Sequence, residues 1–332
     1  MFSKTASFNI KGLACLGIAW HHYIFQSGIP THFLTWFNSL WGALFVGIFF
    51  FLSGYGLTQS LKDKRPTCAL FFKRIVRVLV PLFAIHLILY FPLLKLNIVE
   101  PYCDAKSIFG YLFNGSGNPY LWFVQAILAM YLCFFISSIP KSKNIRIILC
   151  FLLITIYCAL VKYVLKYNGT QYANNFPFVL GYMVALYEQQ IKKFIGNIRP
   201  SSLAVALTAI SIALLMAFHF LRGTVLDDFA FMCNGLCGIP IMMLLNHFRC
   251  FEYRSFKFLG ACSFELYIMQ WWIISFMKNS DLLAFSLFSI FLYLGSCLLL
   301  AYIFSIIDRY LINIYDNLTK ESSSNKFFKN SA

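Results

Sequence analysis

Lys11 and His22 are the residues whose types and spacing most clearly suggest chemistry. Both lie in the first hydrophobic segment of the chain, which otherwise consists mainly of apolar residues. In an α-helix, the interval between them makes about three turns, so both side chains project from one face about 16 Å apart. Ionisable groups inside a membrane are costly and usually face a bundle interior or a water-filled cavity. The pair therefore predicts an interior site with a cation at one end and an imidazole at the other.

The composition identifies the elements that must position this pair. The chain has 332 residues, of which 60% are hydrophobic and 12% charged, and its mean hydropathy is +0.72. Apolar stretches of about 20 residues, the length needed to cross a bilayer as a helix, recur along the chain. We therefore expect an all-α polytopic membrane protein with ten spans. They are 8–27, 38–61, 72–96, 119–139, 145–165, 174–191, 202–221, 228–248, 258–278 and 282–307.

The charge distribution indicates how these spans are oriented. The formal net charge is +15, but the 27 Lys and Arg residues are distributed by loop and form no single patch. If the N-terminus is cytoplasmic, most of them fall on the cytoplasmic side, as the positive-inside rule requires. Both termini are then cytoplasmic, and no nucleic-acid partner is expected. The basic residues on the opposite side are Lys95, Lys106, Lys162, Lys166, Arg222 and Lys278.

The chain is expected to form one transmembrane domain, residues 1–318, followed by a polar cytoplasmic tail, residues 319–332. The outer connection 97–118 is a candidate lid or acceptor-contacting loop, and a plain connector is an equally good interpretation. Cys233 and Cys237 are one helical turn apart, but no further ligand stands at a metal-site spacing around them. We expect packing there and no metal.

Five segments along the chain form a recognisable order. They are FNIKGLACLGIAWHHYIF at 8–25, FFFLSGYGL at 49–57, FFKRIVRVLVPL at 71–82, LWFV at 121–124 and FLGACSFELYIMQ at 258–270. Together they resemble the acyltransferase-3 family of integral membrane O-acyltransferases. Lys11 stands where that family usually has Arg, and Gln270 stands where many members have a second His. Phe8 and Asn9 replace an acidic residue that often precedes the basic one.

His22 occupies the position of the family's histidine, so the resemblance implies that it is catalytic. A neutral imidazole can take a proton from an attacking hydroxyl and return it to a leaving thiolate. A covalent acyl-histidine is the alternative mechanism. His21 is turned by about 100° on the helix and is expected to be structural.

Other residues are expected to bind substrates or line the site. Arg74 and Arg77 lie at the cytoplasmic start of the third span, where guanidinium groups suit the phosphates of CoA; membrane headgroups are the other possible partners. Lys11 is expected to anchor the donor or the site. The two glycines beside Ser53 and Tyr55 indicate a close helix approach or a local break. The expected lining residues are Ser53, Tyr55, Trp122, Glu265 and Tyr267.

Trp122 and Glu265 also have simpler interpretations. Trp122 is equally consistent with an aromatic residue at the membrane interface. The Glu265 carboxylate would either pair with a basic helix end or influence protonation in the site.

The resemblance implies transfer of an acyl group, most simply acetyl, from acyl-CoA to a hydroxyl of a cell-envelope or surface carbohydrate. It also implies a bacterial cytoplasmic membrane. Acyl-CoA would be a co-substrate, and no permanently bound cofactor is expected; the oligomeric state is not specified by the sequence. The main alternative is a glycan or lipid transporter or flippase in which the same residues line a transit path, and a further one is another membrane O-acyltransferase family that acts on lipids or proteins. Motifs for a serine hydrolase elbow, a P-loop or a zinc protease do not occur.

Overall fold

The computed structural model describes residues 1–28, 32–61, 66–97, 120–166 and 169–329. Within these ranges the secondary structure is helical and contains no strand. The proposed lid at 97–118 lies outside the described residues, except for Asn97. The main helices are α1 (Lys4–Gln26), α2 (His32–Leu61), α3 (Cys68–Lys95), α5 (Trp122–Ser137), α6 (Lys143–Ala159), α7 (Gly169–Tyr172), α8 (Pro177–Leu186), α9 (Glu188–Gly196), α10 (Pro200–Leu221), α11 (Asp227–His247), α12 (Lys257–Ala261), α13 (Ser263–Asn279) and α14 (Leu287–Lys329).

Each expected span overlaps a helix, but two expected spans are divided. The stretch 174–191 ends its apolar helix at Leu186, and α9 begins at Glu188 with polar residues. The stretch 258–278 is broken at Cys262, whose φ of −118° and ψ of 19° are not helical. Each of these two spans therefore contains a break in its helix, which follows from local dihedrals that hydropathy does not report.

The apolar helices identify an integral membrane protein. Among the described residues, six helices are long and apolar enough to cross a bilayer, and 122–137 and 173–186 are shorter apolar helices. The helices α1 and α13 are not among the six. Both carry polar side chains that contact the interior, as described below. The all-helical membrane fold is confirmed, while ten spans and cytoplasmic termini remain predictions.

Two glycines bring α2 and α8 into backbone contact. A Cβ added at Gly54 would lie 2.2 Å from the Phe178 carbonyl oxygen, and one added at Gly181 would lie 2.0 Å from the Phe51 carbonyl oxygen. Such close approach requires small residues on both helices. The expected glycine function at the Ser53–Gly56 segment is therefore close packing at Gly54, and α2 continues unbroken to Leu61.

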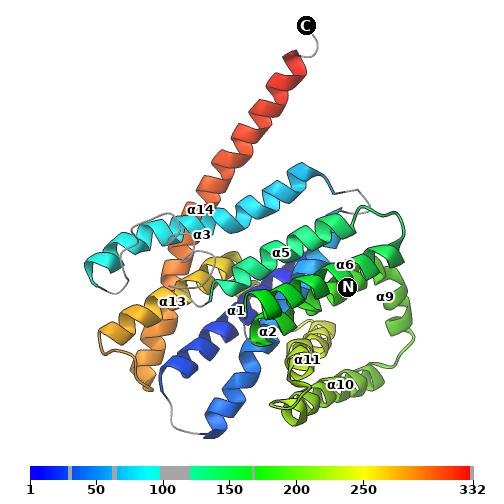
Figure 1. The fold of residues 1–332 in the computed structure, drawn as a ribbon, viewed down its shortest axis with the longest axis horizontal. Coiled ribbons are helices and arrows are strands. Elements are labelled where there is room, and N and C mark those ends of the chain that lie inside the picture. Colours follow the sequence, from blue (N-terminus) through cyan, green and yellow to red (C-terminus); the bar gives the residue numbers. More distant parts are fainter. Residues whose placement is uncertain (29–31, 62–65, 98–119, 167–168, 330–332) are drawn as a thin grey trace.

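The first helix lies inside the bundle (Figure 1), where it packs against α2, α12 and α13. A Cβ at Gly12 would lie 2.4 Å from the Gly260 nitrogen, so α1 and α12 also touch through their backbones. The buried Asn9 amide donates to the carbonyls of Phe251 and Tyr253 at 2.8 and 2.9 Å. These contacts fix the height and rotation of α1, and with them the directions of Lys11 and His22.

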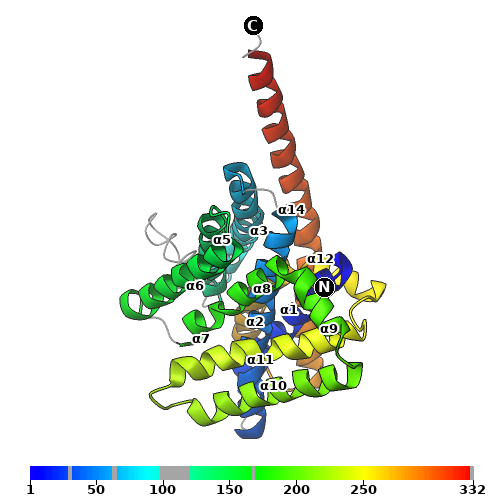
Figure 2. The same ribbon diagram turned by 90° about the vertical axis from the view of Figure 1, so that its right-hand side faces the viewer.

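The last helix extends beyond the rest of the bundle. Figures 1 and 2 show α14 projecting from the other helices toward the C-terminus. Its first part packs against α13 and α3. The helix continues past residue 318 to Lys329, so the expected polar tail begins on the same helix. Helices α10 and α11 form an antiparallel pair on another side of the molecule (Figure 2).

Candidate active site

The His22 imidazole is held by α13. Its Nδ1 atom lies 2.6 Å from Oε1 of Gln270, a side chain that is completely buried. Since an amide oxygen only accepts hydrogen bonds, this contact places the proton of the neutral ring on Nδ1. The Nε2 atom then carries the lone pair. His22 is thus oriented as a hydrogen-bond acceptor toward any group that approaches Nε2.

The contact of the amide nitrogen of Gln270 supports this orientation of its side chain. Its Nε2 lies 3.8 Å from Sγ of Cys15, which itself donates to the Ser263 carbonyl at 2.9 Å. Cys15 and His22 are two turns apart on α1 and therefore share a face. The contacts connect α1 and α13 along this face and leave Oε1 of Gln270 for His22.

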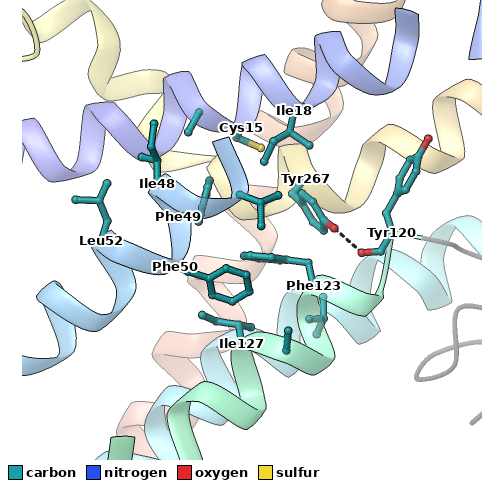
Figure 3. Packing of buried hydrophobic residues seen from close by; sticks show 14 of the residues in the cluster. Cys15, Ile18, Ile48, Phe49, Phe50, Leu52, Tyr120, Phe123, Ile127 and Tyr267 are labelled. Atoms are coloured by element: carbon teal, nitrogen blue, oxygen red, sulfur yellow. Dashed lines mark hydrogen bonds between the residues drawn. The ribbon is translucent and has the colours of Figure 1, made fainter. Parts of the chain in front are cut away.

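One face of the imidazole is covered by Tyr120. The two rings are stacked in parallel, with centroids 3.6 Å apart and an interplanar angle of 2°. Tyr120 directly precedes the Leu121–Trp122–Phe123 segment that begins α5. Its backbone carbonyl accepts a hydrogen bond from the Tyr267 hydroxyl, which Figure 3 shows within the buried cluster. The Tyr267 ring also packs against Phe123, with centroids 4.9 Å apart.

His21 faces a different neighbour. A Cβ added at Gly42 of α2 would lie 2.7 Å from its Nε2, so the ring packs against the α2 backbone. Its ring centroid is 5.4 Å from that of His22. This position suits a packing function for His21 between α1 and α2.

Lys11 lies near a second cation at the other end of the shared face. The charge of Arg74 on α3 acts on the Lys11 ammonium, and Tyr131 of α5 interacts with Arg74. In the described ranges neither cation has an ion pair with a carboxylate. Arg74 and Tyr131 line a narrow pocket with Leu57 and Phe134. Two partly buried cations without an anion form a suitable place for an anionic ligand.

Arg77 lies one turn from Arg74 on α3 but contacts α14 instead of Lys11. Its guanidinium lies 3.8 Å from the Asp316 carboxylate of α14, and Lys73 lies 2.7 Å from the same oxygen. Arg77 and Lys73 are both substantially exposed. The structure therefore brings Arg74 to Lys11 and ties Arg77 to α14.

The expected lining residues are distributed over the length of the site. Ser53 is buried and donates to the Phe49 carbonyl at 2.8 Å. The Tyr55 hydroxyl accepts from the backbone nitrogen of Phe2 at 3.2 Å, so it lies at the start of α1, apart from His22. Tyr267 and Trp122 are at the His22 end, with Trp122 half-buried beside Phe123.

Glu265 belongs to a separate buried group. Its carboxyl lies close enough to Asp308 of α14 for the two to interact, and the Arg309 charge also acts on it. Asp308 is 1% exposed and Glu265 8%. Glu265 forms no ion pair with a basic side chain in the described ranges, so pairing with a basic helix end and an influence on protonation both stay predictions.

The sequence alone did not indicate the functions of Tyr120 and Gln270 as neighbours of His22. Tyr267 and Gln270 stand one turn apart on α13 and so share a face, which was the available signal. The position of Tyr120 depends on a hydrogen bond across 147 positions of the chain. No sequence spacing reports such a contact.

The fold and the site together define an integral membrane protein with an interior polar centre built on its first helix. The family profile described as an acyltransferase domain, of the acyltransferase-3 type, matches residues 7–306, and the chain belongs to this family. The matched range contains Lys11, His22, Arg74 and Gln270. The resemblance drawn from the five sequence segments is thereby confirmed. Neither a curated protein nor a solved structure matches the chain.

Proposed function

We propose that this acyltransferase moves an acetyl group from acetyl-CoA to a hydroxyl of a cell-envelope carbohydrate, with His22 as the catalytic base. The observation that carries the proposal is the contact between Nδ1 of His22 and Oε1 of Gln270. It leaves Nε2 as a proton acceptor, which is the form a base requires. Stacking on Tyr120 restricts rotation of the imidazole about the Cβ–Cγ bond.

The proposed reaction has one proton shuttle. Nε2 of His22 takes the proton from the acceptor hydroxyl as that oxygen attacks the thioester carbonyl. Collapse of the tetrahedral intermediate breaks the carbon–sulfur bond, and the proton on Nε2 passes to the CoA thiolate. The products are the O-acetylated acceptor and CoA, with His22 returned to its neutral form. A covalent acyl-histidine would use the same lone pair on Nε2 as a nucleophile.

The donor would bind at the Lys11 end of the site. Lys11 and Arg74 are two cations without a carboxylate partner among the described residues, and CoA carries a pyrophosphate and a 3′-phosphate. The extended pantetheine arm would follow the face of α1 between Lys11 and His22, an interval of about 16 Å. With the N-terminus cytoplasmic, the donor would enter from the cytosol.

The acceptor would approach the opposite end of the bundle. His22 lies one turn before the end of α1 at Gln26. Tyr120, which stacks on it, lies two positions after the 97–118 connection in sequence. A carbohydrate on the outer side of a bacterial cytoplasmic membrane would thus meet the acetyl group without CoA leaving the cytosol. Family membership supports this reaction over a transporter or flippase.

Mass spectrometry of surface glycans tests the proposal. Cells lacking the gene are compared with cells carrying the wild-type gene or His22→Ala, with protein levels in the membrane measured in each. We expect O-acetyl groups on a surface carbohydrate only with the wild-type gene. Unchanged acetylation together with impaired export of the glycan would identify a transporter and contradict the proposal.

A further inference from the structure

A polar pocket lies beside the proposed donor site, at the ends of α2, α5, α6 and α8. Its volume is about 250 Å³. The polar side chains on its wall include two cations, Lys143 and Arg146, and two hydroxyl groups, those of Ser138 and Tyr182. Both hydroxyl-bearing residues are about 1% exposed, and their oxygens are 2.9 Å apart. The pocket thus has a buried polar floor and a cationic side.

The only carboxylate lining the described part of this pocket is already neutralised. Glu188 contacts the amino group of Met1 and the amide of Gln59, and Lys192 lies 2.7 Å from it. Both carboxylate oxygens of Glu188 are therefore occupied by partners other than Lys143 and Arg146. Its charge does not compensate the cations of α6.

The two cations have backbone contacts but no acidic partner in the described ranges. Lys143 donates to the Leu186 carbonyl at 3.1 Å, and Nε of Arg146 donates to the Pro140 carbonyl at 2.6 Å. The Arg146 contact fixes the guanidinium through one nitrogen and leaves its two terminal nitrogens as donors. Neither residue forms an ion pair with a described carboxylate.

The start of α6 adds to the positive potential. Lys143 is its first residue and Arg146 lies in its first turn. The preceding residue, Ser142, forms no side-chain capping hydrogen bond, and the first turn carries no acidic residue. Backbone N–H groups at a helix start and nearby Lys and Arg side chains attract the same kind of ligand, a phosphate group.

This pocket is adjacent to the one lined by Arg74. The two are separated by the last turns of α5, where the Phe134 ring of the Arg74 pocket packs on Tyr182 with centroids 5.0 Å apart. Leu57 and Thr58, neighbours on α2, line one pocket each. The two pockets therefore border the same end of α2 and the same end of α5.

We propose that Lys143 and Arg146, with Ser138 and Tyr182, form a second phosphate-binding site next to the Lys11–Arg74 cluster. The assignment of its ligand to the nucleotide end of an acyl-CoA rests on the proposed function. A phosphate of an anionic lipid headgroup has the same chemistry and is the other source.

Binding of inorganic pyrophosphate to the purified full-length protein tests the site. The protein is placed in nanodiscs of phosphatidylcholine, which supplies no net negative charge, and carries Lys11→Gln and Arg74→Gln to remove the charges of the neighbouring cluster. We expect Lys143→Gln with Arg146→Gln to weaken the remaining affinity about 10- to 100-fold, since hydrogen bonds between charged groups are lost. High salt is expected to weaken binding as well.

A matched control is provided by Lys193→Gln with Arg199→Gln, which changes the net charge equally. Both residues are exposed and neither lines the pocket. Equal affinity in the pocket and control double variants would overturn the proposal. Loss of affinity confined to the pocket variant would support it. This result does not depend on whether glycan acetylation is found, so the phosphate site and the proposed function are tested independently.

A second arm identifies the source of the phosphate. The same substituted parent and both double variants made in it are compared in nanodiscs with and without phosphatidylglycerol. If the anionic lipid suppresses pyrophosphate binding in the parent, the site also accepts headgroups. If it has no effect, the soluble phosphate is the ligand. Either result supports a phosphate site, provided that binding depends on Lys143 and Arg146.

Discussion

At the His22 end of α1, the protein itself supplies the contacts that orient the side chain, whereas at the Lys11 end two neighbouring cations have no carboxylate partner in the described part of the chain. His22 has Gln270 on one edge and Tyr120 on one face. Lys11 and Arg74 have no carboxylate partner among the described residues. We therefore expect the first end to be preorganised and the second to be completed by a ligand. The following substitutions test this contrast, from the largest expected effect to the smallest.

Replacing His22 with Ala should reduce the transfer rate about 10²- to 10⁴-fold, the usual contribution of a general acid–base group. The measurement is transfer of labelled acetyl from acetyl-CoA by purified protein. His21→Ala, which alters packing against Gly42, is the matched control and should keep most of the activity. Full activity of His22→Ala would contradict the proposal that His22 is the catalytic base.

Gln270→Leu should reduce the rate about 10- to 100-fold while leaving the affinity for acetyl-CoA unchanged. The substitution removes the acceptor that selects the His22 tautomer, and a buried donor left without its partner costs about 1–3 kcal/mol. Gln270→Glu retains an oxygen acceptor and should restore activity. A rise in KM for acetyl-CoA without a change in kcat would place Gln270 at the donor end. It would contradict the assignment of Gln270 to the orientation of His22.

Arg74→Ala should weaken acetyl-CoA binding by about tenfold, because a charge-assisted hydrogen bond is lost. Arg77→Ala is the control one turn away, and its effect should be smaller because Asp316 already pairs with it. Calorimetric titration of acetyl-CoA onto each purified variant measures the difference. Equal losses for the two arginines would mean that their separate partners do not matter for donor binding.

Tyr267→Phe should slow transfer by about threefold to tenfold, the worth of one neutral hydrogen bond. The lost bond fixes the Tyr120 carbonyl and thereby the ring that covers His22. The variant should bind acetyl-CoA like the wild type. A positioning function predicts a lower kcat with an unchanged KM for acetyl-CoA. Thermal unfolding of the purified protein measures general destabilisation, and a lowered Tm would contradict a pure positioning function.

Lys11→Arg should keep or slightly improve donor affinity. Arginine retains the charge and adds a planar fork that suits phosphate, and it is the residue usual at this position in the family. Lys11→Ala should bind the donor less well. The opposite order, with Arg worse than Ala, would indicate that position 11 tolerates no larger cation and would count against an anion at this end.

Sequence reasoning located this site to the extent that its geometry is local. Helix periodicity places Lys11 and His22 on one face, and α1 is indeed one continuous helix from Lys4 to Gln26. The partner of His22 is 248 positions away in the chain, and nothing in the spacing of α1 selects it. Gln270 was recognised only as a departure from the family pattern, although it is the residue that orients the imidazole.

The two arginines show the same limit. Their spacing predicted a pair at one end of α3, which the helix geometry supplies. Their different partners depend on where α14 passes, because Asp316 of that helix meets Arg77 and Lys73. Likewise, hydropathy found the apolar stretches but missed the breaks at Tyr187 and Cys262, since these are set by backbone dihedrals.

The contact between α2 and α8 has a consequence for motion. At Gly54 and Gly181 the backbones meet so closely that neither helix has room to slide past the other without separating. Packed interfaces of this kind change between discrete arrangements more readily than they deform. Any opening that admits substrate therefore has to carry α2 and α8 together as one rigid unit. A hinge between these two helices is thereby excluded.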